Sequence, residues 1–300
     1  MKISGFSFCR NAEKFYYPLA ESIRSVLPIC DEFVVAVGKG DPGDRTREII
    51  AGIGDPRIRI VDTEWTDRER LKGWVHSQQT NIALRACQGD WCFYVQSDEV
   101  VHEKDLPVIR ARCEQLQDDE RVEGLLFRYL HFWGDYDHVH RSHAWYPREI
   151  RMIRNKIGVE SYRSAQSFRR EGERLRVATV DADIYHYGWV RPPSLMKAKE
   201  VELATTHHGR AKALQKCGTA VGEFCYGALD SIPRFRGTHP AVMADWMATF
   251  DWADKLREPE GGRPQHRHER LNYRWLSWVK QCLLRGRVHL GIRGYRGVRV

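Results

Sequence analysis

Two adjacent carboxylates, Asp98 and Glu99, follow a short apolar and aromatic run from Trp91 to Val95. This run comes after a Gly-Asp pair, and its composition is typical of a strand buried on both faces of a parallel sheet. In open α/β sheets, ligands bind at the carboxyl ends of the strands. Adjacent carboxylates cost solvation energy there unless a cation or a basic group meets them. The sequence therefore indicates either a divalent-cation site, in which Asp98 binds the ion through oxygen, or a solvated turn.

The elements around this strand alternate between strand and helix patterns. From the N-terminus the order is β-α-β-α-β, which implies parallel pairing through right-handed crossovers. Strands are expected over 2–9, 32–37, 57–62, 91–95, 122–133, 149–154 and 184–189, and helices over 13–26, 46–53, 71–87, 104–116 and 195–205. Residues 155–183 are charged and are expected to be irregular.

Composition places the chain among soluble globular proteins. Hydrophobic residues make up 42% and charged residues 29%, which argues against disorder. No apolar run approaches the roughly 20 residues that span a bilayer, and the N-terminus lacks the pattern of a secretion signal. The eight cysteines are scattered without a Cys-x-x-Cys pair. They are therefore expected to be reduced thiols in a cytoplasmic protein rather than zinc ligands.

The positive charge of the chain is concentrated at its C-terminus. The formal net charge is +8, and residues 261–300 contain ten Lys and Arg against one acid. The stretch from Leu271 to Leu284 places its apolar residues on one helical face. Such a helix either lies on an anionic bilayer, giving peripheral membrane contact through 265–299, or docks on the catalytic domain. No nucleic-acid-binding motif accompanies the charge, so nucleic acid is not an expected partner.

Several ordered motifs over residues 1–200 resemble GT-A fold glycosyltransferases of the family 2 type. The motifs are Arg10-Asn11 after the first strand, Gly40-Asp41 and Asp44-Arg45-Thr46 after the second, Asn81-Ile82-Ala83-Leu84, Gly89-Asp90-Trp91 through Gln96-Ser97-Asp98-Glu99, Ile150-Arg151-Met152-Ile153-Arg154-Asn155 and Tyr185-His186-Tyr187. The resemblance implies an α/β fold of the GT-A (Rossmann-like) type: a mostly parallel sheet flanked by helices, with a basic helical C-terminal tail. We expect a nucleotide-sugar and acceptor domain over 1–205, a packed helical extension over 206–260 and a basic amphipathic tail over 261–300.

The resemblance also implies a divalent cation, Mn²⁺ or Mg²⁺, on the diphosphate of a nucleoside-diphosphate sugar. The implied metal ligands are Asp98 and His186, and the alternative for His186 is a packed histidine bonded to backbone. The implied nucleotide-sugar contacts are Arg10, Asn11, Gly38, Lys39, Asp41, Arg45, Gln79, Asn81, Gln96 and Ser97.

Three positions depart from the family pattern. Gln96 replaces the first acid of the signature, Gly38 stands where many members carry an Asp that contacts the base, and Gln166 stands in a region where relatives carry a carboxylate. An inverting transferase needs a group that takes the acceptor proton. The candidates are Asp135, Asp137, Glu149 and Glu160. Asp135 ranks first because it follows a strand end, and Glu160 ranks second because it lies nearest to Gln166.

Residues 131–146 concentrate histidine and aromatic side chains, which either stack on an acceptor sugar or hold a long loop in place. The expected function is transfer of a sugar to a glycan or lipid-linked acceptor of polysaccharide biosynthesis, at the cytoplasmic side of the membrane. Two other classes stay open. One is a catalytically impaired nucleotide- or sugar-binding relative, which Gln96 and Gln166 would explain. The other is a nucleotidyltransferase, which would need a Gly-rich loop that residues 4–13 lack.

Overall fold

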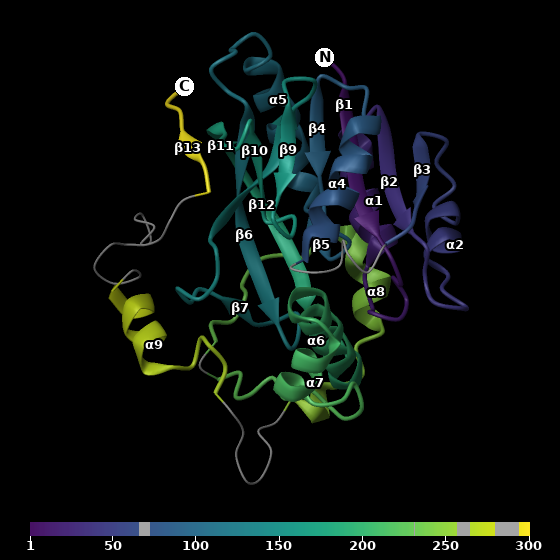
Figure 1. Ribbon diagram of the computed structural model, residues 1–300. Coiled ribbons are helices and arrows are strands. Elements are labelled where there is room, and N and C mark those ends of the chain that lie inside the picture. The colour runs from purple at the N-terminus through teal and green to yellow at the C-terminus, as the bar shows by residue number, and fades with distance from the viewer. Residues whose placement is uncertain (66–72, 231, 257–264, 280–293) are drawn as a thin grey trace.

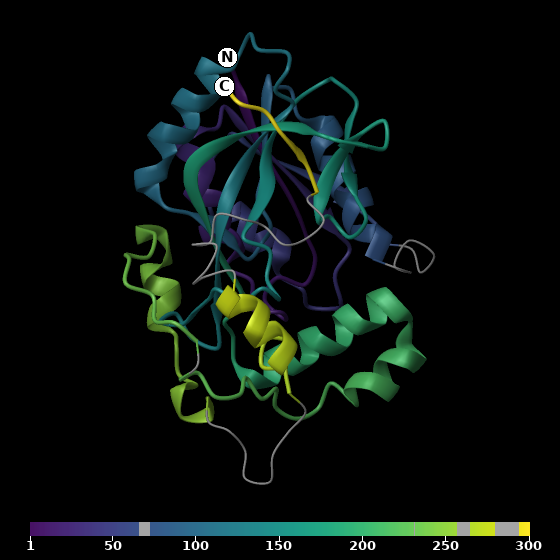
Figure 2. The ribbon, with the colours of Figure 1, turned by 90° about the vertical axis from the view of Figure 1, so that its left-hand side faces the viewer.

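A computed structural model describes residues 1–65, 73–230, 232–256, 265–279 and 294–300. These residues form a long curved sheet with helices on both faces and a small second sheet beside it (Figures 1 and 2). In this part of the chain, no helix has the length and apolar character needed to cross a bilayer.

The N-terminal half builds parallel strands joined by helices. The strands are β1 (Ile3–Cys9), β2 (Glu32–Gly38), β3 (Ile58–Thr63) and β4 (Trp91–Tyr94), and the helices are α1 (Leu19–Val26), η1 (Leu27–Ile29), α2 (Thr46–Ala51) and α4 (Trp74–Ala86). β1 pairs in parallel with β2 and β4, and β2 pairs in parallel with β3, as the β-α-β-α-β order predicted. Helix α1 begins later than expected because Tyr16 has a φ of 51°, which a continuous α-helix does not allow.

The second half extends the same sheet. Its elements are β5 (Glu99–Val101), η3 (Glu103–Asp105), α5 (Leu106–Gln115), β6 (Gly124–Trp133), β7 (Val139–His140), β8 (Arg148–Arg154), β12 (Arg176–Trp189) and β13 (Arg296–Gly297). The main order is β13-β12-β6-β8-β4-β1-β2-β3, in which β8 is antiparallel to β4 and β6 while β12 is parallel to β6. The predicted α/β fold, a mostly parallel sheet flanked by helices, is therefore confirmed. The carboxyl ends of β1, β4, β6 and β12 meet the amino end of β8 at one edge.

The prediction that residues 155–183 are irregular is wrong. They contain β9 (Val159–Tyr162), β10 (Ser167–Arg170) and β11 (Glu173–Arg174), which form a three-stranded antiparallel sheet, and β12 begins among them at Arg176. Phe168 of β10 is buried in the core beside Phe6 and Tyr94. Charged residues in these short strands, such as Arg169 and Arg170 next to Phe168, hide the alternating pattern from a hydrophobicity argument.

Helices cover both faces of the main sheet. On one face, α1 and α5 pack apolar residues such as Ile23 and Ile109 against Phe93 and Phe127. On the other face, α4 and the small sheet cover a second core. Residues on both faces are fully buried, which fits the continuous apolar runs of β2 and β4.

The chain after β12 packs around the carboxyl edge of the sheet (Figure 1). Its elements are α6 (Pro193–His208), α7 (Arg210–Cys217), η4 (Ala241–Met243), α8 (Ala244–Ala248), η5 (Ala253–Lys255) and α9 (Leu271–Trp278). The buried Trp252 indole donates a hydrogen bond of 2.9 Å to the Gly134 carbonyl. The Ser277 hydroxyl of α9 accepts one of 2.8 Å from the His143 backbone. The helix expected to reach Leu284 is present as far as Trp278, and its remainder lies outside the described residues.

Candidate active site

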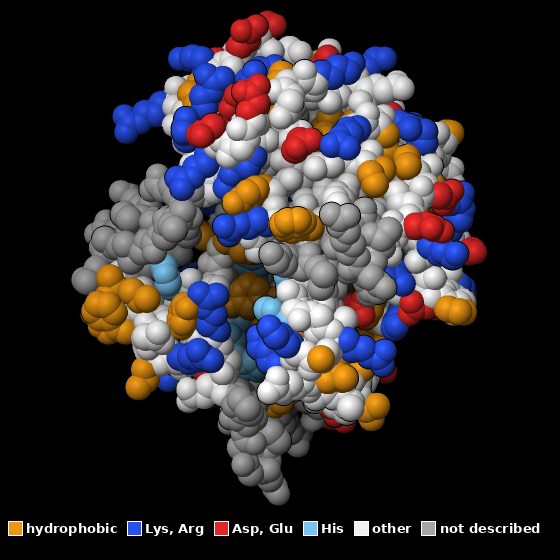
Figure 3. Space-filling model, viewed as in Figure 1, with side chains coloured by type: hydrophobic (Ala, Val, Ile, Leu, Met, Phe, Trp, Pro, Cys, Tyr) orange, Lys and Arg blue, Asp and Glu red, His pale blue; other side chains and the backbone are white. Residues whose placement is uncertain are grey.

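A cleft of about 1170 Å³ opens at the carboxyl edge of the sheet. Its walls come from the loops after β1 and β4, the start of β8, the ends of β6 and β12, the turn between β9 and β10, and helix α6. Figure 3 looks into a hollow on this face, where hydrophobic and histidine side chains lie at the bottom and Lys and Arg side chains surround them.

Asp98 lies in this cleft and is surrounded by cations. Its Oδ2 accepts a hydrogen bond of 3.0 Å from Lys199 Nζ, and the Arg191 guanidinium lies 3.9 Å from the same atom. Lys199 comes from α6 and also donates to the Gly188 carbonyl at 2.9 Å. Burial alone would raise the pKa of Asp98, but the charges of Lys199 and Arg191 favour the carboxylate, and the pKa lies below its ordinary value. Asp98 is therefore ionised at neutral pH.

His186 is held in one tautomer by His131. Burial lowers the pKa of His131 to about 3 and that of His186 to about 4, so both rings are neutral at neutral pH. His131 Nε2 lies 2.7 Å from the Tyr146 carbonyl oxygen, and the two Nδ1 atoms lie 2.9 Å apart. Because a carbonyl only accepts, the hydrogen of His131 is on Nε2, and its Nδ1 accepts from His186 Nδ1. This leaves a lone pair on His186 Nε2.

That lone pair faces Oδ1 of Asp98 across 3.9 Å. Neither atom carries a hydrogen for the other, so the two could together hold a divalent cation. Gly188 keeps the space open, because a Cβ there would lie 2.5 Å from His186 Nε2 and 2.8 Å from Asp98 Oδ2. Within the described residues, no three His, Cys, Asp or Glu side chains gather around such a point. The residues therefore fit a cation that a substrate helps to bind, as is usual for Mg²⁺ with phosphates.

Glu99 turns away from the cleft into the core. Its carboxylate accepts two hydrogen bonds of 2.7 Å from Arg151 and one of 2.7 Å from the Tyr129 hydroxyl. The Glu99 and Arg151 side chains are 0% and 1% exposed. Glu99 also accepts from the Gln96 backbone N–H at 3.1 Å. This ion pair thus fixes the turn that presents Asp98 to the cleft.

One part of the cleft holds a cluster of aromatic rings beside a cation. Phe8 stacks on His76 with ring centres 5.7 Å apart, and Trp65 lies 6.2 Å from Phe8. The Arg10 guanidinium lies 5.4 Å from the Trp65 ring centre. A Cβ on Gly38 would lie 2.4 Å from Trp65 Nε1, so the glycine at the end of β2 lets the indole lie against the backbone. Such clusters suit the stacking of a nucleobase.

Another part of the cleft is lined by tryptophans. Trp133 stacks on Trp189 with ring centres 4.9 Å apart, and Trp145 meets Trp189 edge-on at 5.6 Å. The residues of the excursion 131–146 in the described lining are Trp133, Ala144, Trp145 and Tyr146. Indole faces are suited to stacking against sugar rings.

The cleft gathers half of the residues that the resemblance implied. Those in its described lining are Arg10, Asn11, Gln96, Ser97, Asp98 and His186. Lys39, Asp41 and Arg45, in the loop after β2, form ion pairs outside the lining instead. The pairs are Asp41 with Arg10 at 3.2 Å and with Lys14, Lys39 with Glu64 at 3.6 Å, and Arg45 with Glu13. Gln79 is buried in α4 and accepts a hydrogen bond from the Thr63 hydroxyl.

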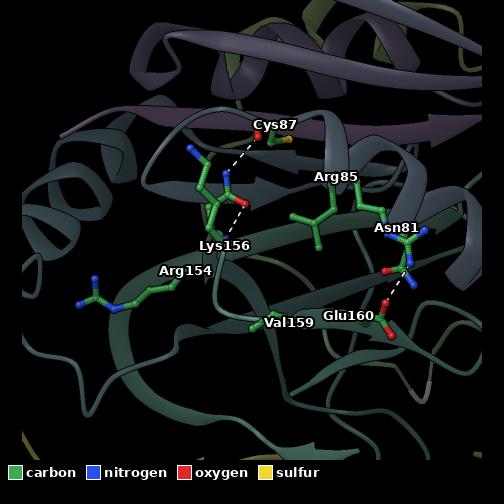
Figure 4. A pocket seen from close by; sticks show the side chains of 10 residues that line it. Asn81, Arg85, Cys87, Arg154, Lys156, Val159 and Glu160 are labelled. Atoms are coloured by element: carbon green, nitrogen blue, oxygen red, sulfur yellow. Dashed lines mark hydrogen bonds and ion pairs between the residues drawn. The ribbon is translucent and has the colours of Figure 1, made fainter. Parts of the chain in front are cut away.

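Asn81 and Glu160 line a separate pocket of about 300 Å³ (Figure 4). Glu160 pairs with Arg85 at 2.9 Å, and Asn81 Oδ1 accepts from the Ser161 backbone N–H at 2.7 Å. Cys87 lies just before β4 and lines the same pocket, so this pocket lies toward the amino end of β4. The contacts of Asn81 and Glu160 thus join β9 to α4.

Asp135 holds the turn between β6 and β7. Its carboxylate lies 2.8 Å and 2.9 Å from His138 Nδ1 and accepts from the backbone N–H groups of Asp137 and His138. It is not in the described lining of the cleft.

Glu149 is the candidate base that does line the cleft. It lies near the start of β8, whose neighbour β4 leads to Asp98. Burial raises the pKa of Glu149, while Arg151, Ser167 and Arg169 act in the opposite direction. A carboxylate with a raised pKa in a cleft is suited to accepting a proton near neutral pH. Sequence reasoning included Glu149 but could not rank it, and it missed Lys199, which looks like an ordinary surface residue of a helix.

No family model matches the chain, and no curated protein matches it. Solved structures with a similar fold include S. aureus TarS, at 16% identity and a TM-score of 0.38, over 72% of this chain and 42% of TarS. They also include TarS 1–349 in complex with UDP, at 15% identity, a TM-score of 0.37, and 72% and 69% coverage. A third is Mycobacterium tuberculosis glucosyl-3-phosphoglycerate synthase with Mn²⁺, UDP and phosphoglyceric acid, at 21% identity, a TM-score of 0.29 and 43% coverage of each chain. Likeness of this degree says nothing about substrate, and the fold assignment follows from the sheet order of the chain itself.

Proposed function

We propose that the chain is a divalent-cation-dependent glycosyltransferase that moves a sugar from a nucleoside diphosphate to a glycan or lipid-linked acceptor. The observation that carries this proposal is the pair of lone-pair atoms, Asp98 Oδ1 and His186 Nε2, that face each other at 3.9 Å. This pair lies in a cleft that holds aromatic rings in two of its parts. A nucleobase would occupy the part at Phe8 and Trp65, and the acceptor sugar the part at Trp189.

The central part of the cleft suits a leaving diphosphate. Asp98 and His186 would hold the cation, which when bound neutralises charge on the phosphate oxygens. As the bond to the anomeric carbon breaks, negative charge grows on the diphosphate. Lys199 and Arg191 place two fixed cations beside the single carboxylate of Asp98, so the site carries surplus positive charge for the donor. Fixed charges of this kind stabilise a developing anion without reorganisation.

Glu149 is the proposed base, which makes the proposed transfer an inverting one. Its carboxylate would take the proton of the acceptor hydroxyl as oxygen attacks the anomeric carbon. Glu149→Gln is expected to lower the transfer rate by about 10² to 10⁴-fold while nucleotide affinity stays unchanged. Glu160→Gln is the matched control, because Glu160 lies in the separate pocket of Figure 4. A Glu149→Gln enzyme with full activity would remove this residue from the reaction.

Calorimetry with UDP, GDP and CDP, each with Mn²⁺ and with EDTA, tests the function. We expect one nucleotide to bind in a metal-dependent manner and its sugar conjugates to release that nucleotide on incubation with the protein. Metal-dependent binding without turnover of any donor would favour the impaired relative. Binding of a nucleoside triphosphate with release of pyrophosphate would favour the nucleotidyltransferase. Absence of nucleotide binding would reject the proposal.

We further propose peripheral membrane contact through α9, which fits a lipid-linked acceptor. Leu271, Trp275 and Trp278 are 83%, 63% and 56% exposed, and the exposed Arg270 and Arg274 lie beside them. Tryptophan and arginine together favour the surface of an anionic bilayer. The protein should co-sediment with phosphatidylglycerol vesicles, and Trp275→Ala with Trp278→Ala should abolish this without lowering the melting temperature. If the double variant bound the vesicles as well as the wild type does, α9 would instead be assigned to docking on the catalytic domain.

A further inference from the structure

One wall of the cleft holds arginines without carboxylate partners. Arg169 of β10, Arg174 of β11 and Arg163 of the turn between β9 and β10 all belong to the cleft lining. Across the described part of the chain, no ion pair involves any of the three, whereas Arg170, Arg176 and Arg296 nearby are all paired.

The pairing register shows that this imbalance belongs to one face of the small sheet. Arg169 lies directly opposite Arg174, and like charges in such cross-strand positions destabilise a sheet. The next pair along the same strands is Arg170 opposite Glu173, and Arg170 also pairs with Glu123 at 3.0 Å. Glu160 of β9 lies opposite Arg169 on its other side, but its carboxylate pairs with Arg85, so no ion pair among the described residues neutralises Arg169 and Arg174. Arg170 lies on the opposite face of β10, together with the buried Phe168, and is paired.

Cation–π contacts and hydrogen bonds hold two of these arginines, Arg163 and Arg169, in place. The guanidinium carbons of Arg169 and Arg163 lie 4.5 Å and 5.0 Å from the Tyr162 ring centre. Arg169 Nη1 also donates to the Phe168 and Gly294 carbonyls at 2.8 Å and 2.7 Å. Arg163 itself has a φ of 55°, a backbone conformation that non-glycine residues rarely adopt. Sparsely populated backbone conformations persist at binding sites where the surroundings enforce them.

We propose that Arg163, Arg169 and Arg174 bind an oxyanion carried by the acceptor, so that the acceptor is acidic through a phosphate, sulfate or carboxylate group. This inference rests on the proposed function, because it names the chemical class of that acceptor. Guanidinium groups bind such anions through paired N–H donors. Glu149 lies in the same wall, close enough to Arg169 for their charges to interact. The acceptor hydroxyl at Glu149 would therefore lie beside the anion, while the donor diphosphate occupies the Asp98 side.

Binding of inorganic anions tests the site. Calorimetry with inorganic phosphate, inorganic sulfate and acetate is done at low ionic strength, with Mn²⁺ and the tightest-binding nucleoside diphosphate present to fill the donor site. We expect at least one anion to bind, and Arg169→Gln with Arg174→Gln to weaken it by about tenfold or more. The order of the three anions distinguishes a phosphate, sulfate or carboxylate acceptor. Arg170→Gln, on the opposite face of the same strand, is the matched control and should change the affinity less than about twofold.

Nucleotide affinity, measured separately, distinguishes the outcomes. Weaker anion binding with unchanged nucleotide affinity supports the acidic acceptor. An equal loss of nucleotide affinity would assign the arginines to the donor and overturn the inference, as would an anion affinity that the double variant leaves unchanged. If no nucleotide binds the wild type, the proposed function fails, and the acceptor assignment fails with it even where phosphate still binds. Thermal melts verify that the variants fold. If the double variant unfolds, Arg174→Gln alone replaces it, because Arg174 is exposed.

Discussion

Two neighbouring carboxylates, Asp98 and Glu99, lie in regions that differ in how completely their charges are paired. In the Glu99 region, one carboxylate meets one guanidinium, and Tyr129 and a backbone N–H satisfy further lone pairs. In the Asp98 region, two cations face one carboxylate, and a histidine nitrogen presents a lone pair without a donor. Incomplete pairing is costly for folding alone, and it marks the region that a ligand completes.

The same contrast separates the two faces of the small sheet. One face pairs Arg170 with Glu123. The cleft face sets Arg169 against Arg174, and the acid opposite Arg169, Glu160, pairs with Arg85 instead. Complete pairing stabilises the fold, and incomplete pairing prepares a site for charge supplied by a substrate.

The largest expected effect is that of Glu99→Gln on stability. The substitution leaves the Arg151 guanidinium buried without a countercharge, and breaking a buried pair in this way costs about 3–5 kcal/mol. The free energy of unfolding from urea titration measures the loss. Adding Arg151→Met should recover part of it, because the double variant no longer buries an unpaired charge. A loss below about 1 kcal/mol would show that the ion pair of Glu99 contributes little to the stability of the fold, and the contrast with the Asp98 region would fail.

Asp98→Asn should affect binding rather than folding. We expect the Mn²⁺-dependent part of nucleoside diphosphate affinity to fall by about 100-fold or more, since even partners outside a metal's ligand set cost 10–100-fold. The free energy of unfolding should change less than in Glu99→Gln. Calorimetry with Mn²⁺ and with EDTA separates the two contributions. Unchanged Mn²⁺-dependent affinity would remove Asp98 from the cation site.

His131→Phe should weaken cation binding by about tenfold, because it removes the acceptor that holds the hydrogen on His186 Nδ1. Electron paramagnetic resonance of free Mn²⁺ measures this directly, and nucleotide affinity in EDTA should not change. His131→Asn, whose side-chain oxygen accepts a hydrogen bond, should restore part of the affinity. Identical affinities for all three proteins would show that His131 only packs.

The smallest expected effect concerns pH and Lys199. Burial lowers the pKa of Lys199 to about 8, with Arg191 acting in the same direction and Asp98 against it. The charged form attracts the diphosphate and is lost as pH rises through this value. Nucleotide affinity in EDTA should therefore fall several-fold between about pH 7 and about pH 9. Lys199→Met should have weak affinity that does not change over this range, and a wild-type affinity independent of pH would contradict the role given to Lys199.

Much of the fold was predictable because it is encoded among neighbouring residues. Apolar runs and helical spacing predicted the parallel start of the sheet, and the Gly-Asp turn located the strand that precedes Asp98. The same reasoning failed over 155–183, where arginines on short strands hide the alternation. It also chose Asp135 because it follows a strand end and Glu160 because it lies near Gln166 in the chain, and neither reaches the described cleft lining.

The amino-acid sequence by itself determined that Asp98 and Glu99 follow a buried strand at the ligand-binding edge. Only the tertiary structure decided that Asp98 faces the cleft and Glu99 the core. Their partners are distant in the chain, with Lys199 lying 101 residues from Asp98 and Arg151 lying 52 residues from Glu99. Strand order and register bring such partners together, and a local pattern of side chains contains no information about either.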